Sequence, residues 1–191
     1  MIPELNQSGV LPPFIPEIGP TNPAAMAPYR VTITEFVQRY AKSKERIEIL
    51  KGLLAYRELL RNRGITEGFQ WVDGSFVEDV ERNKGRPPSD IDLVTFANRP
   101  PNNDDPDKWR KLVNDNPELF IPDVSKETFI CDAYFVDLNI QPIHLVKSTS
   151  YWFGLFSHQR DTYLWKGMVE ISIICNDEEA KVILEQEVGN A

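Results

Sequence analysis

Two aspartates, Asp90 and Asp92, stand at the start of an apolar run that has the composition of a β-strand. Residues two apart in an extended strand point to the same face, so their carboxylates would lie about 6–7 Å apart along the strand. Unpaired carboxylates at this spacing repel each other and raise each other's pKa values. A divalent cation removes the repulsion, and carboxylate oxygens suit a hard ion such as Mg²⁺ or Mn²⁺. The pair therefore predicts a metal site.

Gly74 and Ser75 precede the two aspartates and end an apolar run over residues 69–72. Glycine lets a backbone approach a phosphate without a side-chain clash, and the N–H groups of a helix that starts there would bind an anion. The Ser75 hydroxyl adds another hydrogen-bond donor. Together with the metal site, this turn predicts binding of a nucleoside triphosphate (NTP).

A third carboxylate would complete such a site, and two candidates lie on one strand. Asp132 is flanked by good strand formers, whereas Asp137 stands near the end of the strand. The two are five residues apart and must face opposite sides, so only one can join the site. We favour Asp132 and keep Asp137 as the alternative.

Each piece also has a plainer explanation. A Gly-Ser pair is usually an ordinary turn, and an Asp-x-Asp pair arises by chance on many solvent-facing strands. Yet two carboxylates beside Ile91, Leu93 and Val94 are costly to bury without a partner, which favours the metal hypothesis.

Several other side chains are weaker candidates than these, and each has an ordinary structural explanation. Basic residues that could reach a phosphate are Arg82, Lys84, Arg86, Lys147, Arg160 and Lys166. His158 could be a base or a phosphate ligand, and the aromatic run Tyr151-Trp152-Phe153 could stack on a nucleobase. Glu78, Asp79 and Glu81 are expected to be solvated charges.

The elements that must position these residues follow from periodicity and capping signals. The Thr-x-x-Glu spacing at Thr32 predicts a helix to about residue 40, and Ser43 can cap a second helix to residue 63. Further helices are expected over residues 108–113 and 177–188, the last with Asp177 as its cap. Strands are expected over residues 69–72, 91–96, 128–138 and 167–174. The pattern is α+β, a small mixed sheet with flanking helices.

Residues 1–29 hold seven of the fifteen prolines. Proline has no backbone N–H to donate and its φ angle is fixed, which predicts an extended, Pro-rich N-terminal arm over these residues. A single domain is expected to follow over residues 30–191. The arm could lie across the domain surface or bind a partner protein.

Composition limits the function classes. The chain has 191 residues and a formal net charge of −8, which disfavours loose adhesion to nucleic acid or to an anionic membrane. No apolar stretch is long enough to span a membrane. Cys131 and Cys175 form no CxxC motif and read as free thiols in a reducing, cytoplasmic setting.

The motif as a whole resembles the nucleotidyltransferase superfamily of the DNA polymerase β type, in its minimal form. The resemblance covers residues 69–137 and rests on Val72-Asp73-Gly74-Ser75, on Asp90-Ile91-Asp92-Leu93 and on Asp132. It implies that Asp90, Asp92 and Asp132 are catalytic metal ligands and that Gly74 and Ser75 hold the NTP. The interval of fourteen residues between Ser75 and Asp90 is slightly long for that superfamily. Extra loop length costs little free energy, so the fold expectation stands.

The whole chain also looks like an uncharacterised bacterial family of small nucleotidyltransferase-like proteins. That likeness rests on residues 9–13, 71–76, 132–137 and 151–158. It implies transfer of a nucleoside monophosphate from an NTP to a hydroxyl of a protein, an RNA or a small molecule, in a toxin–antitoxin or phage-defence setting. Two alternatives stay open: a catalytically silent module of the same fold, acting as an antitoxin or sensor, and a metal-dependent phosphatase or nuclease.

Overall fold

The computed structural model describes residues 1–103 and 105–188; residue 104 and residues 189–191, which belong to the domain expected over 30–191, lie outside that description. The strands are β1 (Tyr29–Val31), β2 (Gly68–Asp73), β3 (Ile91–Ala97), β4 (Cys131–Asp137) and β5 (Val169–Ser172). The α-helices are α1 (Ile33–Tyr40), α2 (Lys44–Asn62), α3 (Val80–Lys84), α4 (Pro106–Asp115), α5 (Pro117–Phe120), α6 (Pro122–Phe129), α7 (Pro142–Phe156) and α8 (Asp177–Val188). Short 3-10 turns are η1 (Pro23–Ala25), η2 (Ser75–Val77) and η3 (Pro101–Asn103).

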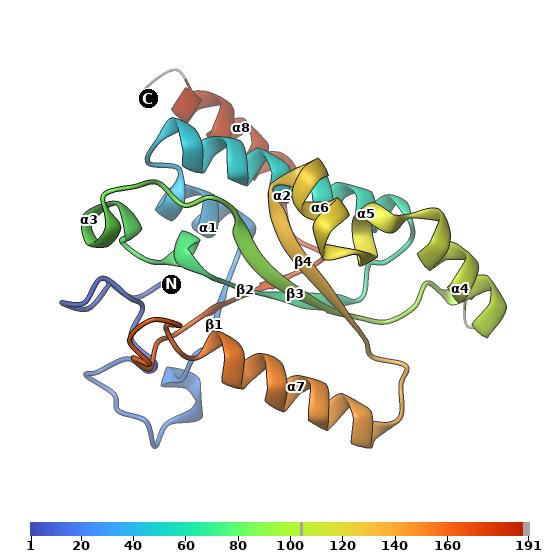
Figure 1. Cartoon of the computed structure of the whole chain (residues 1–191), viewed down its shortest axis with the longest axis horizontal. Helices are drawn as coiled ribbons and strands as arrows, with labels where there is room; N and C mark the ends of the chain where they lie inside the picture. Colours follow the sequence, from blue (N-terminus) through green and yellow to red (C-terminus); the bar gives the residue numbers. More distant parts are fainter. Residues whose placement is uncertain (104, 189–191) are drawn as a thin grey trace.

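The strands form one sheet in the order β1-β5-β2-β3-β4. β2 runs antiparallel to both of its neighbours, β3 and β5. By contrast, β1 pairs with β5 and β4 pairs with β3 in parallel. The sheet is thus mixed, and helices lie on both of its sides (Figure 1). The α+β class with a small mixed sheet and flanking helices is therefore confirmed.

The first two helices begin at the capping residues that the sequence predicts. Thr32 and Glu35 form a reciprocal capping box, in which the Glu35 N–H donates to Thr32 Oγ1 (3.1 Å) and the Thr32 N–H donates to Glu35 Oε2 (2.9 Å). Ser43 caps α2 by accepting from the Arg46 N–H at 3.3 Å. These side chains satisfy donors that a helix start leaves unpaired.

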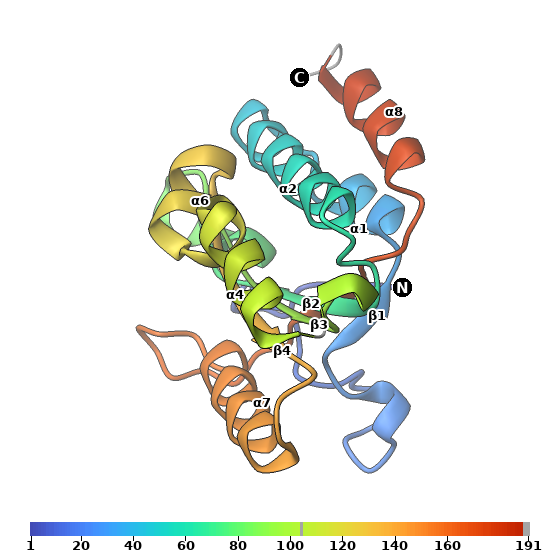
Figure 2. The same cartoon turned by 90° about the vertical axis from the view of Figure 1, so that its right-hand side faces the viewer.

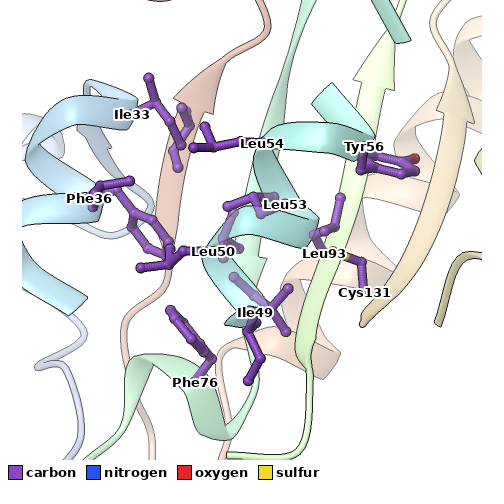
Figure 3. Close-up of a cluster of buried hydrophobic side chains, with 14 of the residues drawn as sticks. Ile33, Phe36, Ile49, Leu50, Leu53, Leu54, Tyr56, Phe76, Leu93 and Cys131 are labelled. Carbon is purple, nitrogen blue, oxygen red and sulfur yellow. The ribbon is translucent and has the colours of Figure 1, made fainter. Parts of the chain in front are cut away.

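Alternation along β3 divides the core between the two sides of the sheet. Leu93 belongs to a buried cluster with Leu50 and Leu53 of α2, on the side that α1, α2 and α8 cover (Figure 3). The next residue, Val94, belongs to a second cluster with Trp152 of α7. Two views at right angles place α7 on the opposite side of the sheet from α2 and α8 (Figure 1 and Figure 2). Side chains of β3 at even positions therefore face α7.

The N-terminal segment packs closely on the rest of the chain. Val10 and Leu11 are fully buried. Backbone hydrogen bonds run from the Asp79 N–H to the Gly9 carbonyl and from the Gly167 N–H to the Leu11 carbonyl, each 2.8 Å long. Tyr29, which the sequence assigned to the arm, instead begins β1 and joins the sheet.

One sequence expectation about the second half of the chain is wrong. Residues 128 and 129 end α6, and the strand expected from residue 128 begins only at Cys131. Ile130 has φ 59° and separates the two elements. The aromatic run over residues 151–153 lies within the apolar helix α7. Within the described ranges, no helix is both long and apolar enough to cross a membrane.

Asp177 is the first residue of α8, and its carboxylate has a different role from the cap that we expected. The guanidinium of Arg57, which is fully buried, donates to it from Nε and Nη2 at 2.9 Å each. Arg57 Nη1 also donates to Gln70 Oε1 of β2 at 2.6 Å. This network joins α2, β2 and α8 across the core.

Candidate functional site

The strand register brings three aspartates into one row. Asp92 pairs with Asp73 across the antiparallel β2–β3 ladder and with Asp132 across the parallel β3–β4 ladder. Residues paired across a sheet share a face, so all three side chains project on the side of α7. Asp90 stands one residue before β3 and is buried. The chain therefore places carboxylates from three neighbouring strand ends together.

Gly74 is held against this row by close packing. It has φ +80°, a conformation that residues with a side chain rarely adopt. A Cβ atom at this position would overlap Oδ2 of Asp92. Ser75 follows as the first residue of η2. The expected helix start at Ser75 is therefore a three-residue 3-10 turn, and the lack of a side chain at Gly74 lets the backbone pass beside the Asp92 carboxylate.

These side chains line one pocket of about 590 Å³. All five residues that the sequence assigns to the site reach it, namely Gly74, Ser75, Asp90, Asp92 and Asp132. Asp137 lies at the other end of β4, where its Oδ2 pairs with Arg99 Nη2 at 2.7 Å. Of the two candidates on this strand, Asp132 is thus the one that shares a pocket with Asp90 and Asp92.

Cationic side chains line the same pocket as the aspartates. Lys84, Arg86 and Arg160 are exposed and line it, and His158 lies beside them. The Lys84 ammonium pairs with Asp161 at 2.7 Å. Arg82 and Lys147, the other basic candidates, do not line this pocket. The cations that do reach the pocket would favour an anionic ligand there.

A buried lysine contacts the Gly-Ser turn and the residues on either side of it. Lys166 is 3% exposed, and its Nζ contacts Asp73 Oδ2 at 3.1 Å and Glu78 Oε1 at 2.7 Å. The same Nζ donates to the Gly74 carbonyl at 3.4 Å. Gln159 Nε2 donates to the second oxygen of Glu78 at 2.8 Å. The expectation that Glu78 is a solvated charge is therefore wrong, and Lys166 has internal partners.

Burial also changes the protonation chemistry of two aspartates. It raises the pKa of Asp73 to about 7, although Lys166 acts in the opposite direction. Asp73 Oδ1 is buried and accepts no hydrogen bond within the described part of the chain. Burial, together with the charges of Asp90 and Asp132, raises the pKa of Asp92 to about 6. Both carboxylates are thus destabilised in their charged form.

Asp90 has a lysine partner that sequence reasoning missed. Lys126 of α6 forms an ion pair with Asp90 Oδ2, and Ser89 Oγ donates to Asp90 Oδ1 at 3.1 Å. Hydrogen bonding to Asp90 raises the pKa of Lys126. No local pattern pointed to this contact, because the two residues come from separate elements and Lys126 sits in a helix that the sequence did not predict.

The donor atoms suit a hard divalent cation. Asp90, Asp92 and Asp132 supply only carboxylate oxygens, the ligands that Mg²⁺ and Mn²⁺ prefer. Across residues 1–103 and 105–188, however, no three Asp, Glu, His or Cys side chains already form a compact metal-ligand group. Cys131 is buried and Cys175 is half-buried, and both are free thiols. The residues fit a metal ion in donor type, with Asp90 engaged by Lys126.

The aromatic run proposed to stack on a base has another position. Trp152 packs against Tyr134, with ring centroids 4.6 Å apart, in the second core cluster. The aromatic residues that line the pocket are Phe156 and Tyr163. Tyr163 is 83% exposed and has φ 58°, which is unusual for a bulky side chain.

Comparison with known proteins gives a family and no function. No curated protein and no solved structure matches the chain. A family profile matches residues 3–172, which is most of its length. The chain therefore belongs to this family, which is described as a family of unknown function (DUF6932).

Proposed function

We propose that the protein is a metal-dependent nucleotidyltransferase, which transfers a nucleoside monophosphate from an NTP to a hydroxyl group. In this reaction the acceptor oxygen forms a bond to the α-phosphorus, the bond to the pyrophosphate oxygen breaks, and the hydroxyl proton passes to a base. Pyrophosphate leaves with the electron pair of the broken bond. The acceptor would be a protein, an RNA or a small molecule.

One observation carries this proposal: Asp92 packs against Gly74 in the same pocket as Asp90 and Asp132. A metal ion on these aspartates must lie next to a backbone turn that has no side chain in the way. A triphosphate needs that geometry, since its phosphates must reach both the metal and the backbone. Lys84, Arg86 and Arg160 line the same space and would attract the polyanion.

The roles of the residues follow from their positions. Asp90, Asp92 and Asp132 would hold Mg²⁺ or Mn²⁺, which when bound neutralises the phosphates and stabilises the charge of the transition state. Asp132, on the outer strand β4, would also orient the acceptor hydroxyl and receive its proton. The Ser75 hydroxyl would donate to a phosphate oxygen. Lys166 would hold the Gly74 turn in place through its contacts with Asp73 and Glu78.

The test is labelling with each of the four α-³²P NTPs and Mg²⁺, in the presence of protein, RNA or small-molecule extracts. We expect label on one acceptor class, release of pyrophosphate, and loss of label in Asp92→Asn. Asp107→Asn is the matched control, since that aspartate is on α4, is 86% exposed and is absent from the pocket lining. Release of inorganic phosphate without label transfer would instead indicate a phosphatase or nuclease.

A catalytically silent binding module is the second candidate, and the outer side of α7 favours it. Ile143, Val146, Tyr151 and Leu155 are 44–62% exposed on this helix. Large exposed apolar patches often mark protein interaction sites. Calorimetry with NTP and Mg²⁺ separates the two functions: the enzyme should bind the nucleotide, whereas the module should bind none and still form a stable complex with a partner protein.

A further inference from the structure

We propose that Lys126 is an internal counter-ion for Asp90, which a bound polyphosphate draws away, so that divalent cation and polyphosphate enter the pocket cooperatively. The inference rests on the proposed function, because it assumes that both ligands bind at this pocket. It adds a role for a residue on α6 that lies outside the motif.

The pairing of charges around the pocket is uneven. Asp73 and Glu78 share the single ammonium of Lys166, whereas Asp90 has Lys126 as its partner. Asp92 and Asp132 form no ion pair with any residue that the structure describes. A divalent cation therefore meets two carboxylates without a cationic partner and a third that already has one.

The two lysines differ in how firmly they are held. The Lys166 side chain is 3% exposed and contacts three oxygens, those of Asp73 at the end of β2, of the Gly74 carbonyl and of Glu78 directly after η2. The Lys126 side chain is 50% exposed, and Asp90 is its ion-pair partner. A half-exposed lysine keeps contact with solvent and can change rotamer, and a bound cation would replace it as the partner of the buried Asp90 carboxylate. Of these two lysines, Lys126 is thus the one able to exchange one anion for another.

A polyphosphate provides the alternative anion. Phosphate oxygens accept charge-assisted hydrogen bonds from lysine at least as well as a carboxylate does. Lys126 and Asp90 both line the pocket, so a phosphate that binds there can take the ammonium from Asp90. Asp90 then becomes available to a cation. Because such coupling is reciprocal, a bound cation must equally favour polyphosphate binding.

One substitution separates this competition from general damage, because its two effects have opposite signs. Lys126→Gln should bind Mn²⁺ alone about tenfold more tightly than the wild type, within the usual range of coupling between sites. The same variant should bind the preformed Mg²⁺–tripolyphosphate complex more weakly. Both affinities are measured by calorimetry, and tripolyphosphate is used because it carries no base. A variant that is merely misfolded would lose both affinities.

Three further variants make the outcome decisive. Lys126→Arg keeps the charge and should behave like the wild type. It gives a second test of the charge if Lys126→Gln proves unstable. Lys111→Gln is the matched control, since Lys111 pairs with Asp115 on α4 and does not line the pocket. In Asp90→Asn, the gain from Lys126→Gln should disappear. Unchanged or weaker Mn²⁺ binding by Lys126→Gln, with binding still dependent on Asp92, overturns this inference alone. If neither the wild type nor any variant binds cation or polyphosphate, the proposed function fails as well.

Discussion

Oδ2 of Asp92 occupies the space in which any residue other than glycine would place its Cβ at position 74. The two residues are thus interdependent: the Gly-Ser turn exists in this form because a carboxylate of the next strand packs on it. The motif is a contact between β3 and the residue that follows β2, and a substitution on either side should disturb the other.

Gly74→Ala should therefore lower both stability and nucleotide binding. The backbone conformation alone costs about 1–3 kcal/mol for a residue with a Cβ, because φ 80° with ψ −165° is a region that essentially only glycine adopts. Displacement of the Asp92 carboxylate adds to this cost. Gly19→Ala is the matched control, because Gly19 has φ +86° and a Cβ added there would meet no atom within 4 Å. Urea unfolding and calorimetry measure the two effects. Equal losses in both variants would show that the Asp92 contact is unimportant.

Asp132→Asn and Asp137→Asn should have opposite profiles. Asp132 lines the pocket, so its substitution should weaken Mg²⁺-dependent NTP binding at least tenfold, or about 1.4 kcal/mol. Asp137 pairs with the half-buried Arg99 away from the pocket, so its substitution should lower the free energy of unfolding and spare NTP binding. A loss of binding confined to Asp137→Asn would move the third carboxylate to the alternative that the sequence left open.

Stability of the metal-free protein should fall as pH rises from about 4 to 7. Asp73 and Asp92 have pKa values raised from 3.8 to about 7 and about 6. In that window the folded state binds more protons than the unfolded state, and each pKa unit corresponds to about 1.4 kcal/mol. Urea unfolding in EDTA at pH 5 and pH 7.5 measures the slope. Asp73→Asn should flatten it, and a stability that rises over this range would contradict the assignment.

Arg57→Met should destabilise the fold strongly, by about 3–5 kcal/mol, because it leaves the Asp177 carboxylate buried without its main partner. Arg110→Met is the matched control, since Arg110 is 69% exposed and pairs with Asp107 on the surface. Its effect should stay within about 0.5 kcal/mol. Thermal unfolding monitored by circular dichroism compares the two, and similar midpoints would show that the buried network contributes little.

Local signals predicted the first half of the fold well. The capping residues Thr32 and Ser43 marked α1 and α2, and the apolar runs after Gly68 and Asp90 became β2 and β3. The second half was harder because the apolar run that leads into β4 includes the end of a helix. The αL conformation of Ile130, which divides the helix from β4, has no signature in the residue types.

The site shows the same limit. The positions of Gly74, Asp90, Asp92 and Asp132 followed from strand periodicity and spacing, which are local properties. The pairs Lys166–Glu78 and Lys126–Asp90 join residues that are far apart in the chain, and a single sequence contains no information about such contacts. An indirect signal existed for Lys166 alone, since it directly precedes the apolar stretch that forms β5.

The two walls of the pocket are more than eighty residues apart in sequence, yet one short stretch near the start of the chain bonds to both. The Gly9 carbonyl accepts from Asp79, next to Glu78, and the Leu11 carbonyl accepts from Gly167, next to Lys166. Glu78 and Lys166 themselves form an ion pair at 2.7 Å. A shortened protein that starts at Tyr29 would keep every strand of the sheet and lose this bridge. Such a protein would also lose the fully buried side chains of Val10 and Leu11, so the first dozen residues belong in any assay of the pocket.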